Sequence, residues 1–240
     1  MSKPKKVNRY PQIYGNVFCY FCTRCIQSLF MNNELKKIIV KVSELYMRYG
    51  IKSVTMDDVA SHLSISKKTL YRYVSDKDDL VGKVIDLQIE TLRTEMDCKC
   101  NTELNAVEEL LIVSKMINHK MKNMNPGTIY DLKKYYPEHY KRFQVARREK
   151  MHSNIVNNIR KGKAEGIYRS DLDENIITKL QISRVENIID NELFSVEEYT
   201  SNKIFQEIFV YHIRGIANQQ GINFLENKLA SFDIEDLNNI

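Results

Sequence analysis

"IKSVTMDDVASHLSISKKTLYRYVSDKDDL", residues 51–80, contains three candidate helix starts separated by short turns. Thr55 is followed three residues later by Asp58, which predicts an N-cap with an acid at the third helical position. Ser66 predicts a second cap, directly after the short turn "SIS" at residues 64–66. Ser75 predicts a third cap, with acids in the first turn, where the helix dipole favours negative charge. We therefore expect a helix, a three-residue turn, a second helix and then the start of a third.

The proportions of residues 55–74 are those of a DNA-binding helix-turn-helix. In such a motif the second helix docks one face on the first and leaves the other for a groove of DNA. At 100° per residue, turning Leu70 toward the core places Val74 beside it. The opposite face then carries Lys68, Thr69, Tyr71 and Arg72, with Lys67 at its edge. This pattern predicts a surface that contacts a negatively charged partner.

The rest of the chain indicates an all-α protein. Apolar residues at three- and four-residue steps predict a helix from residue 33 that ends at Gly50, a favourable residue after a helix C-terminus. Further helices are expected at about 80–98, 103–124, 138–164, 174–193 and 197–219. We expect a helix-turn-helix domain at 33–79, a second helical domain at 80–220, and a C-terminal tail at 221–240. Residues 1–32 are expected to be an extension outside the core.

The net charge of +5 comes entirely from that extension. Residues 1–32 carry five basic residues and no acid, which leaves 36 − 5 = 31 Lys and Arg against 31 Asp and Glu in the remainder. The overall basicity is therefore no argument for nucleic-acid binding. Only the basic cluster around Lys67–Arg72 supports it. The same extension contains Cys19, Cys22 and Cys25, for which the alternatives are a metal site that lacks a fourth ligand nearby and no metal role at all.

Several classes of function have no sequence signature here. There is no P-loop, no Gly-rich dinucleotide fingerprint, no His-Glu-x-x-His and no nucleophile elbow, so an enzyme is not expected. No metal and no cofactor are expected either. Without the extension only Cys98 and Cys100 remain, which favours a cytoplasmic protein with reduced thiols. No apolar run is long enough to span a membrane.

"ELKKIIVKVSELYMRYGIKSVTMDDVASHLSISKKTLYRYVSDKDDLV", residues 34–81, resembles the N-terminal domain of TetR-type (TetR/AcrR) transcriptional regulators. The matching positions are Gly50, Thr55, Val59–Ala60, Leu70–Tyr71, Tyr73 and Lys77. The order of caps, turn and Leu-Tyr pair recurs as a whole, which makes the match specific. Ser64 stands where the family usually has glycine, so the backbone of the turn is expected to differ slightly.

The resemblance implies roles for individual residues in contacting double-stranded DNA. Phosphate contacts are implied for Thr55, Tyr71, Tyr73 and Lys77. Base contacts are implied for Lys67, Lys68, Thr69 and Arg72. The alternative for Tyr71 and Tyr73 is packing between helices, toward which Tyr73 lies closer. The alternative for Lys67 and Lys68 is solubilising surface charge.

The resemblance also implies a homodimer on a palindromic operator, acting as a repressor that a small-molecule effector releases. It makes 80–220 the expected effector-binding and dimerisation domain. The apolar stripes of 174–193 and 197–219 are the candidate dimer face, with monomer core as the alternative. Methionine and aromatic residues indicate an effector pocket, again with core as the alternative: Met116, Met121, Tyr130, Tyr136, Tyr140 and Phe143. The competing function is a helical protein-interaction module that does not bind DNA.

Overall fold

The structure is a computed structural model, and it describes residues 34–94, 104–190, 194–195, 198 and 202–231. These residues form helices and no strand, which confirms the all-α fold. The helices are α2 (Glu34–Tyr49), α3 (Met56–His62), α4 (Lys67–Leu70), α5 (Lys77–Thr94), α6 (Ala106–Asn123), α7 (Gly127–Tyr135), α8 (Pro137–Ala164), α9 (Glu174–Asp190), α11 (Asn202–Ile216) and α12 (Gln219–Ser231). The extension expected at 1–32, with its cysteines, lies outside the described residues.

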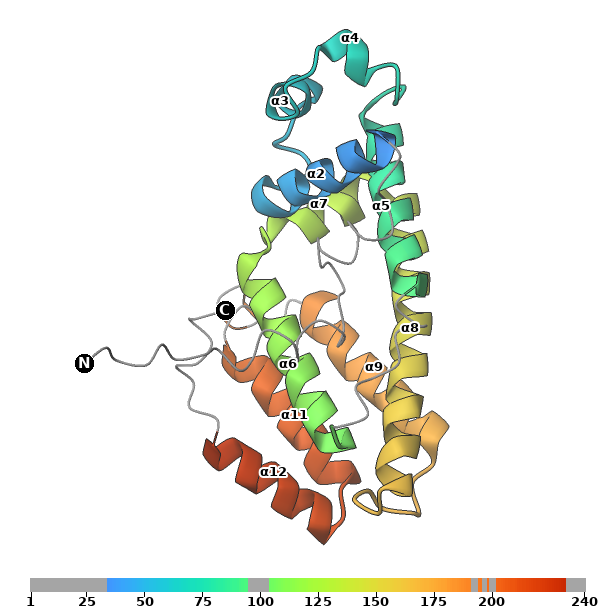
Figure 1. Ribbon diagram of the computed structural model, residues 1–240, viewed down its shortest axis with the longest axis vertical. Helices are drawn as coiled ribbons and strands as arrows, with labels where there is room; N and C mark the ends of the chain where they lie inside the picture. The colour runs from blue at the N-terminus through green and yellow to red at the C-terminus, as the bar shows by residue number, and fades with distance from the viewer. Residues whose placement is uncertain (1–33, 95–103, 191–193, 196–197, 199–201, 232–240) are drawn as a thin grey trace, which may run out of the picture.

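The molecule is elongated, with α3 and α4 at one end and α12 at the other (Figure 1). The long helix α8 runs along one side, where it packs against α5 and then α9. On the other side α6 packs against α11. This arrangement places the helix-turn-helix at an exposed tip, above a body of roughly parallel and antiparallel helices.

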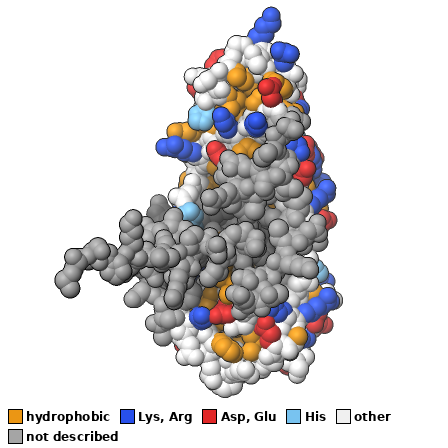
Figure 2. Space-filling view, in the orientation of Figure 1, with side chains coloured by type: hydrophobic (Ala, Val, Ile, Leu, Met, Phe, Trp, Pro, Cys, Tyr) orange, Lys and Arg blue, Asp and Glu red, His pale blue; other side chains and the backbone are white. Residues whose placement is uncertain are grey.

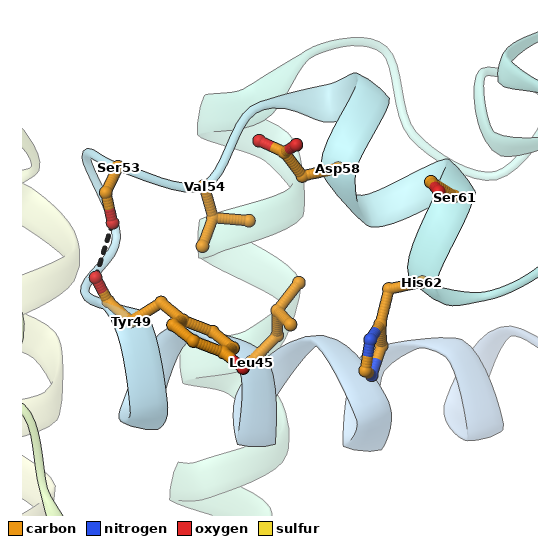
Figure 3. Close-up of a pocket in the computed structure, with 7 residues that line it drawn as sticks. All are labelled: Leu45, Tyr49, Ser53, Val54, Asp58, Ser61 and His62. Atoms are coloured by element: carbon orange, nitrogen blue, oxygen red, sulfur yellow. Dashed lines mark hydrogen bonds between the residues drawn. The ribbon is translucent and has the colours of Figure 1, made fainter.

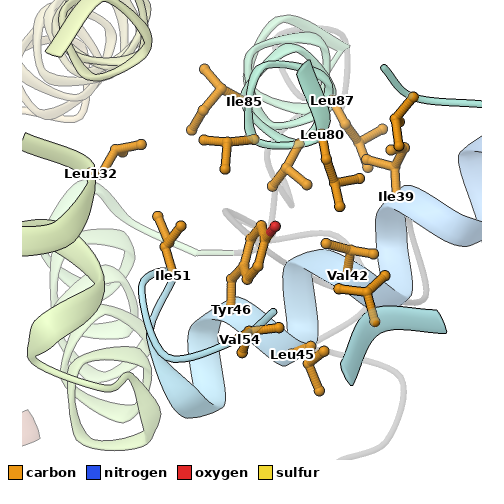
Figure 4. Packing of buried hydrophobic residues seen from close by; sticks show 14 of the residues in the cluster. Ile39, Val42, Leu45, Tyr46, Ile51, Val54, Leu80, Ile85, Leu87 and Leu132 are labelled. Carbon is orange, nitrogen blue, oxygen red and sulfur yellow. The ribbon is translucent and has the colours of Figure 1, made fainter. Parts of the chain in front are cut away.

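Two separate apolar clusters support the two ends. The first cluster joins α2, α3, α4 and α5 with Leu132 of α7 and Ala146 of α8. Figure 4 shows the ring of Tyr46 pointing from α2 toward the apolar side chains of α5. The second cluster joins α6, the end of α8, the loop after it, α11 and α12. Each cluster includes side chains that are fully buried, such as Leu70 in the first and Ile159 in the second.

Three features differ from the sequence-based expectations. The expected boundary between residues 79 and 80 falls inside α5, so the first cluster extends across it. The cap of α5 is Asp76 and not Ser75: Asp76 Oδ1 accepts from the N–H of Asp79 at 2.9 Å, while the Ser75 N–H donates to Asp79 Oδ2 at 2.9 Å. Residues 221–231, expected in a tail, belong to α12, whose Leu225 is fully buried.

Within the described residues, no helix is long and apolar enough to cross a membrane.

Candidate nucleic-acid interface

The first helix of the motif starts at a capping box. Thr55 Oγ1 accepts from the N–H of Asp58 at 3.1 Å, and Asp58 Oδ2 accepts from the N–H of Thr55 at 2.8 Å. These bonds satisfy N–H groups that a helix start leaves unpaired. They also hold the pKa of the Asp58 carboxyl below its usual range, because Thr55 bonds to the charged form. The predicted cap is confirmed.

The turn between α3 and α4 passes through Ser64, whose φ of 56° is the only positive value at a described residue other than glycine. The N–H of Ser64 donates to Ser61 O and that of Ile65 to Ala60 O, each at 3.0 Å. A left-handed backbone is costly for a residue with a Cβ. A glycine, which the resembled family usually has at this position, would avoid that cost.

The second helix is shorter than expected. Regular α4 covers only Lys67–Leu70, with Ser66 Oγ accepting from the Thr69 N–H at 3.0 Å, and residues 71–73 continue as turns. The predicted orientation is confirmed, since Leu70 is fully buried and Val74 almost so. On the opposite side Lys67, Lys68, Tyr71 and Arg72 are exposed, while Thr69 and Tyr73 are half-buried.

The basic residues of this outer face differ in their partners. Lys67 Nζ lies 2.9 Å from the Asp57 carboxylate, so this lysine is tied to α3. Lys68 and Arg72 are exposed and make no hydrogen bond or ion pair with a described residue. Figure 2 shows Lys and Arg side chains at the tip that α3 and α4 form. Lys68 and Arg72 are therefore the cations most available to an external acceptor.

The two tyrosines occupy different environments. Tyr71 is 43% exposed, and its hydroxyl makes no hydrogen bond to a described residue. Tyr73 packs against the first cluster, and its hydroxyl donates to Glu34 Oε2 at 2.5 Å. Tyr73 therefore links the turn after α4 to the start of α2.

Lys77, at the start of α5, lies against the loop between α2 and α3. Its Nζ donates to the carbonyl of Lys52 at 3.2 Å, and partial burial lowers its pKa. A lysine held in this way keeps two N–H donors for another acceptor. Thr55, Lys77 and Lys52 thus belong to one connected patch beside the tip.

Sequence reasoning missed the contacts that fix this loop from the other side. The N–H of Lys52 donates to Asp131 Oδ2 of α7 at 2.7 Å, and Lys52 Nζ donates to the Tyr135 hydroxyl at 2.8 Å. Thr128 Oγ1 donates to the carbonyl of Tyr46 at 3.0 Å. Partners about eighty positions apart leave no local pattern, so only the folded chain reveals that α7 supports the loop.

A groove between α2 and α3 lies beside the tip (Figure 3). It is lined by Leu45, Tyr49, Ser53, Val54, Asp58, Ser61 and His62. None of the residues expected to contact DNA lines this groove, although Asp58, the capping partner of Thr55, does.

The described residues expected to form an effector pocket lie in different surroundings. Tyr136, Tyr140 and Phe143 pack against the first cluster, and Tyr130 is 57% exposed on α7. Met116 lies half-buried on α6, and the side chain of Met121 lies outside the described structure.

Comparison with known proteins supports the assignment of the tip. Residues 38–84 match the family model described as bacterial regulatory proteins, tetR family. The chain is 26% identical over 182 residues to YvaF of Bacillus subtilis (strain 168), an uncharacterized HTH-type transcriptional regulator, with 75% of this chain and 94% of YvaF covered.

Solved structures show the same fold. A transcriptional regulator from Cytophaga hutchinsonii ATCC 33406 is similar with a TM-score of 0.61 at 20% identity, covering 78% of this chain and 100% of that one. A regulatory protein TetR from Rhodobacter sphaeroides is similar with a TM-score of 0.58 at 15% identity, covering 75% and 99%.

Proposed function

Since the chain belongs to the TetR family of DNA-binding transcriptional regulators, we propose that it is a homodimeric repressor, acting in the cytoplasm, that a small molecule releases from a palindromic operator. The observation that carries the DNA contact is the outer face of the tip, where Lys68 and Arg72 are exposed beside the buried Leu70. A dimer places two such tips about one DNA turn apart, which suits a palindrome.

The contacts divide into two kinds. Lys68 and Arg72 can donate to guanine O6 and N7, and the methyl group of Thr69 can contact thymine. Thr55, Tyr71 and Lys77 suit phosphate oxygens, which position a protein without reading sequence. Lys67 and Tyr73 have intramolecular partners, so their contacts to DNA would be shared with Asp57 and Glu34.

The salt dependence of binding tests this division. Each phosphate contact made by a cation adds about one to the slope of log affinity against log salt. We expect Lys77→Ala to weaken binding to all sequences and reduce the slope by about one. Lys68→Ala should instead weaken binding most at the preferred operator.

The control is Lys141→Ala, which removes an exposed lysine from α8, far from the tip along the chain. Equal affinity and equal slope for the wild type, Lys68→Ala and Lys77→Ala would refute the proposed contacts. The operator is sought first in DNA from upstream of the protein's own gene. Selection of the sequences that the protein binds then defines it.

The dimer face is proposed on α9 and α11. Most apolar residues of α11 are used by the second cluster, but Ile176 and Leu180 of α9 are each 57% exposed and Tyr211 of α11 is 69% exposed. The guanidinium carbon of Arg184 lies 4.9 Å from the centre of the Tyr211 ring and connects the two helices. Exposed apolar side chains on adjacent helices are typical of an interface.

Leu180→Glu should convert the dimer to a monomer in light scattering at micromolar concentration. Val145→Glu is the matched control, because Val145 is 50% exposed on α8. A wild type that is strictly monomeric at this concentration would overturn the proposed dimer.

A further inference from the structure

Lysine and tyrosine side chains form an exposed patch where α7 meets the loop between α2 and α3. Lys52 of the loop and Tyr130, Lys134 and Tyr135 of α7 are all exposed. In Figure 1, α7 lies next to α2, between the tip and the body, and the two helices are in contact. We call these four residues the lysine–tyrosine patch. None of the four is among the residues expected to contact DNA, so the proposed function gives the patch no role.

Two of its cations lie on one aromatic ring. Lys52 Nζ is 4.7 Å and Lys134 Nζ is 5.5 Å from the centre of the Tyr135 ring. Each cation is attracted by the ring, but only by about 0.5–1 kcal/mol at an exposed site. The two ammonium groups also repel each other, since they share one small region of the surface. An anion bound at the patch would relieve that repulsion.

The hydrogen-bond partners of the two lysines are uncharged. Lys52 Nζ donates to the Tyr135 hydroxyl at 2.8 Å, and Lys134 Nζ donates to the Tyr130 hydroxyl at 2.7 Å. These bonds raise the pKa of both lysines, so both are charged near pH 7. Neither lysine forms an ion pair with a carboxylate among the described residues. Two positive charges therefore remain at the surface without a carboxylate in direct contact.

The hydrogen bonds leave the patch rich in donors. Each tyrosine hydroxyl accepts from a lysine and keeps its own O–H for another acceptor. Each ammonium group uses one N–H in the bond to its tyrosine and has others to donate. The patch thus offers donors and positive charge together, which suits a partner that presents negatively charged oxygen atoms.

The acids near the patch already have partners. Asp131 is buried, and its Oδ2 accepts from the N–H of Lys52 at 2.7 Å. Asp58 belongs to the capping box and accepts from Thr55. Lys133, which is also exposed on α7, adds a further positive charge to this helix. The surface around Lys52 and Lys134 is therefore positive overall.

The patch is continuous with the phosphate contacts proposed above. Lys77 Nζ donates to the carbonyl of Lys52 at 3.2 Å, so Lys52 connects Lys77 to the patch. Thr55 follows Lys52 by three residues, which places their Cα atoms no more than about 11 Å apart. Because each DNA strand carries a phosphate every ~3.4 Å along the helix axis, neighbouring phosphates lie within this range.

We propose that the DNA interface continues from the tip on to α7, where Lys52 and Lys134 contact phosphates of the DNA backbone and the hydroxyls of Tyr130 and Tyr135 add hydrogen bonds. This inference rests on the proposed function, because it extends the surface that holds the operator. Phosphate contacts position a protein without reading sequence. The patch therefore adds affinity for any DNA, while the outer face of the tip supplies specificity.

The salt dependence of binding by the full chain tests the proposal. Lys52→Ala and Lys134→Ala should each reduce the slope of log affinity against log salt by about one. Each should weaken binding to the operator and to unrelated DNA by the same factor, roughly five- to tenfold at 0.1 M salt. Lys134→Arg keeps the charge and should retain the slope. Lys141→Ala, on α8, is again the control and should match the wild type.

A merely structural role would not change the salt slope. Lys77 bonds to the backbone carbonyl of Lys52, so Lys52→Ala leaves that bond in place. Ethylation of single phosphates gives a second readout, because an ethyl group blocks a contact at a known position. Some ethylated phosphates should hinder the wild type and have no effect on Lys134→Ala. If every phosphate that hinders the wild type hinders this variant equally, the contact of Lys134 is refuted.

The outcomes separate this inference from the proposed function. If Lys77→Ala reduces the salt slope while Lys52→Ala and Lys134→Ala do not, the proposed function stands and the extension on to α7 fails. If the wild type binds no DNA, both fail. Polyglutamate represents an acidic protein partner. If Lys134→Ala loses retention on polyglutamate but keeps its DNA affinity, the patch belongs to such a partner and the proposal is overturned.

Discussion

The tip and the middle of the molecule use polar residues in opposite ways. At the tip, Thr55, Ser66 and Asp76 pair with backbone groups only three residues away and remain exposed or nearly so. Further from the tip, Thr178 of α9 and His212 of α11 are buried and come from helices that are distant in the sequence. Local pairing shapes the tip, whereas the burial of Thr178 and His212 depends on how whole helices pack.

Removal of a core side chain beneath the tip should have the largest effect. Leu70→Ala deletes a fully buried side chain and should cost about 3 kcal/mol of unfolding free energy, measured by chemical denaturation. Because Leu70 docks α4, operator binding should be lost even where the protein remains folded. Ile159→Ala, in the second cluster, should cost a similar amount and leave operator affinity per folded molecule nearly unchanged. Equal loss of operator affinity in both variants would contradict the expected difference between the tip and the second cluster.

The buried His212 should make the protein sensitive to acid. The pKa of His212 is lowered to about 4 by burial and by Arg184, so the unfolded chain binds a proton near pH 6.5 that the folded chain excludes. The contribution is present above pH 6.5 and is lost as the pH falls toward 4, by about 3 kcal/mol. Denaturation at pH 7 and pH 4.5 should show a smaller loss in His212→Gln than in the wild type. His62→Gln, an exposed histidine of α3, should behave like the wild type.

The contact between α7 and the loop before α3 should show an intermediate effect. Asp131→Ala leaves the N–H of Lys52 without its acceptor and should lower stability by about 1–2 kcal/mol. Operator affinity should fall as well, since the carbonyl of Lys52 holds Lys77. Asp131→Asn retains an acceptor oxygen and should preserve much of both. If neither variant changes operator affinity in a binding titration, α7 does not support the tip.

The smallest effect is expected in the turn. Ser64→Gly relieves the strain of a positive φ and should stabilise the protein by about 0.5–1 kcal/mol with no change in operator affinity. Ser61→Gly, inside α3, should destabilise by about the same amount, because glycine weakens a helix interior. Calorimetric melting temperatures compare the two variants, and a destabilising Ser64→Gly would show that the hydroxyl has a role in the turn.

The sequence was sufficient where structure is set by near neighbours. The caps at Thr55 and Ser66 and the burial of Leu70 and Val74 all follow from spacing. The third cap differed by one residue because the carboxylate of Asp76 accepts from the Asp79 N–H. No pattern of spacing could bring Asp131 to Lys52 or Thr128 to Tyr46, since those positions depend on how whole helices pack.

The helix α12 was missed, because the tail was expected to begin at residue 221. Ile222, Leu225 and Leu229 recur at helical spacing and pack in the second cluster. In the folded chain a Cβ at Gly221 would lie 2.2 Å from the carbonyl oxygen of Ile167. The glycine is needed for the close contact between α12 and the loop after α8, and it does not end a helix.

The first cluster also has a consequence for synthesis of the chain on the ribosome. Its buried residues extend from Ile39 to Ala146, so α2 to α5 emerge before the side chains that complete their core. Between Leu92 and Ala146 the ribosome must add 146 − 92 = 54 residues, which takes roughly 3–10 s at typical rates of elongation. During that interval the apolar faces of α2 and α5 lack their cover from α7 and α8. The nascent tip is therefore a candidate substrate for chaperones, and it becomes competent to bind DNA only after α8 has been made.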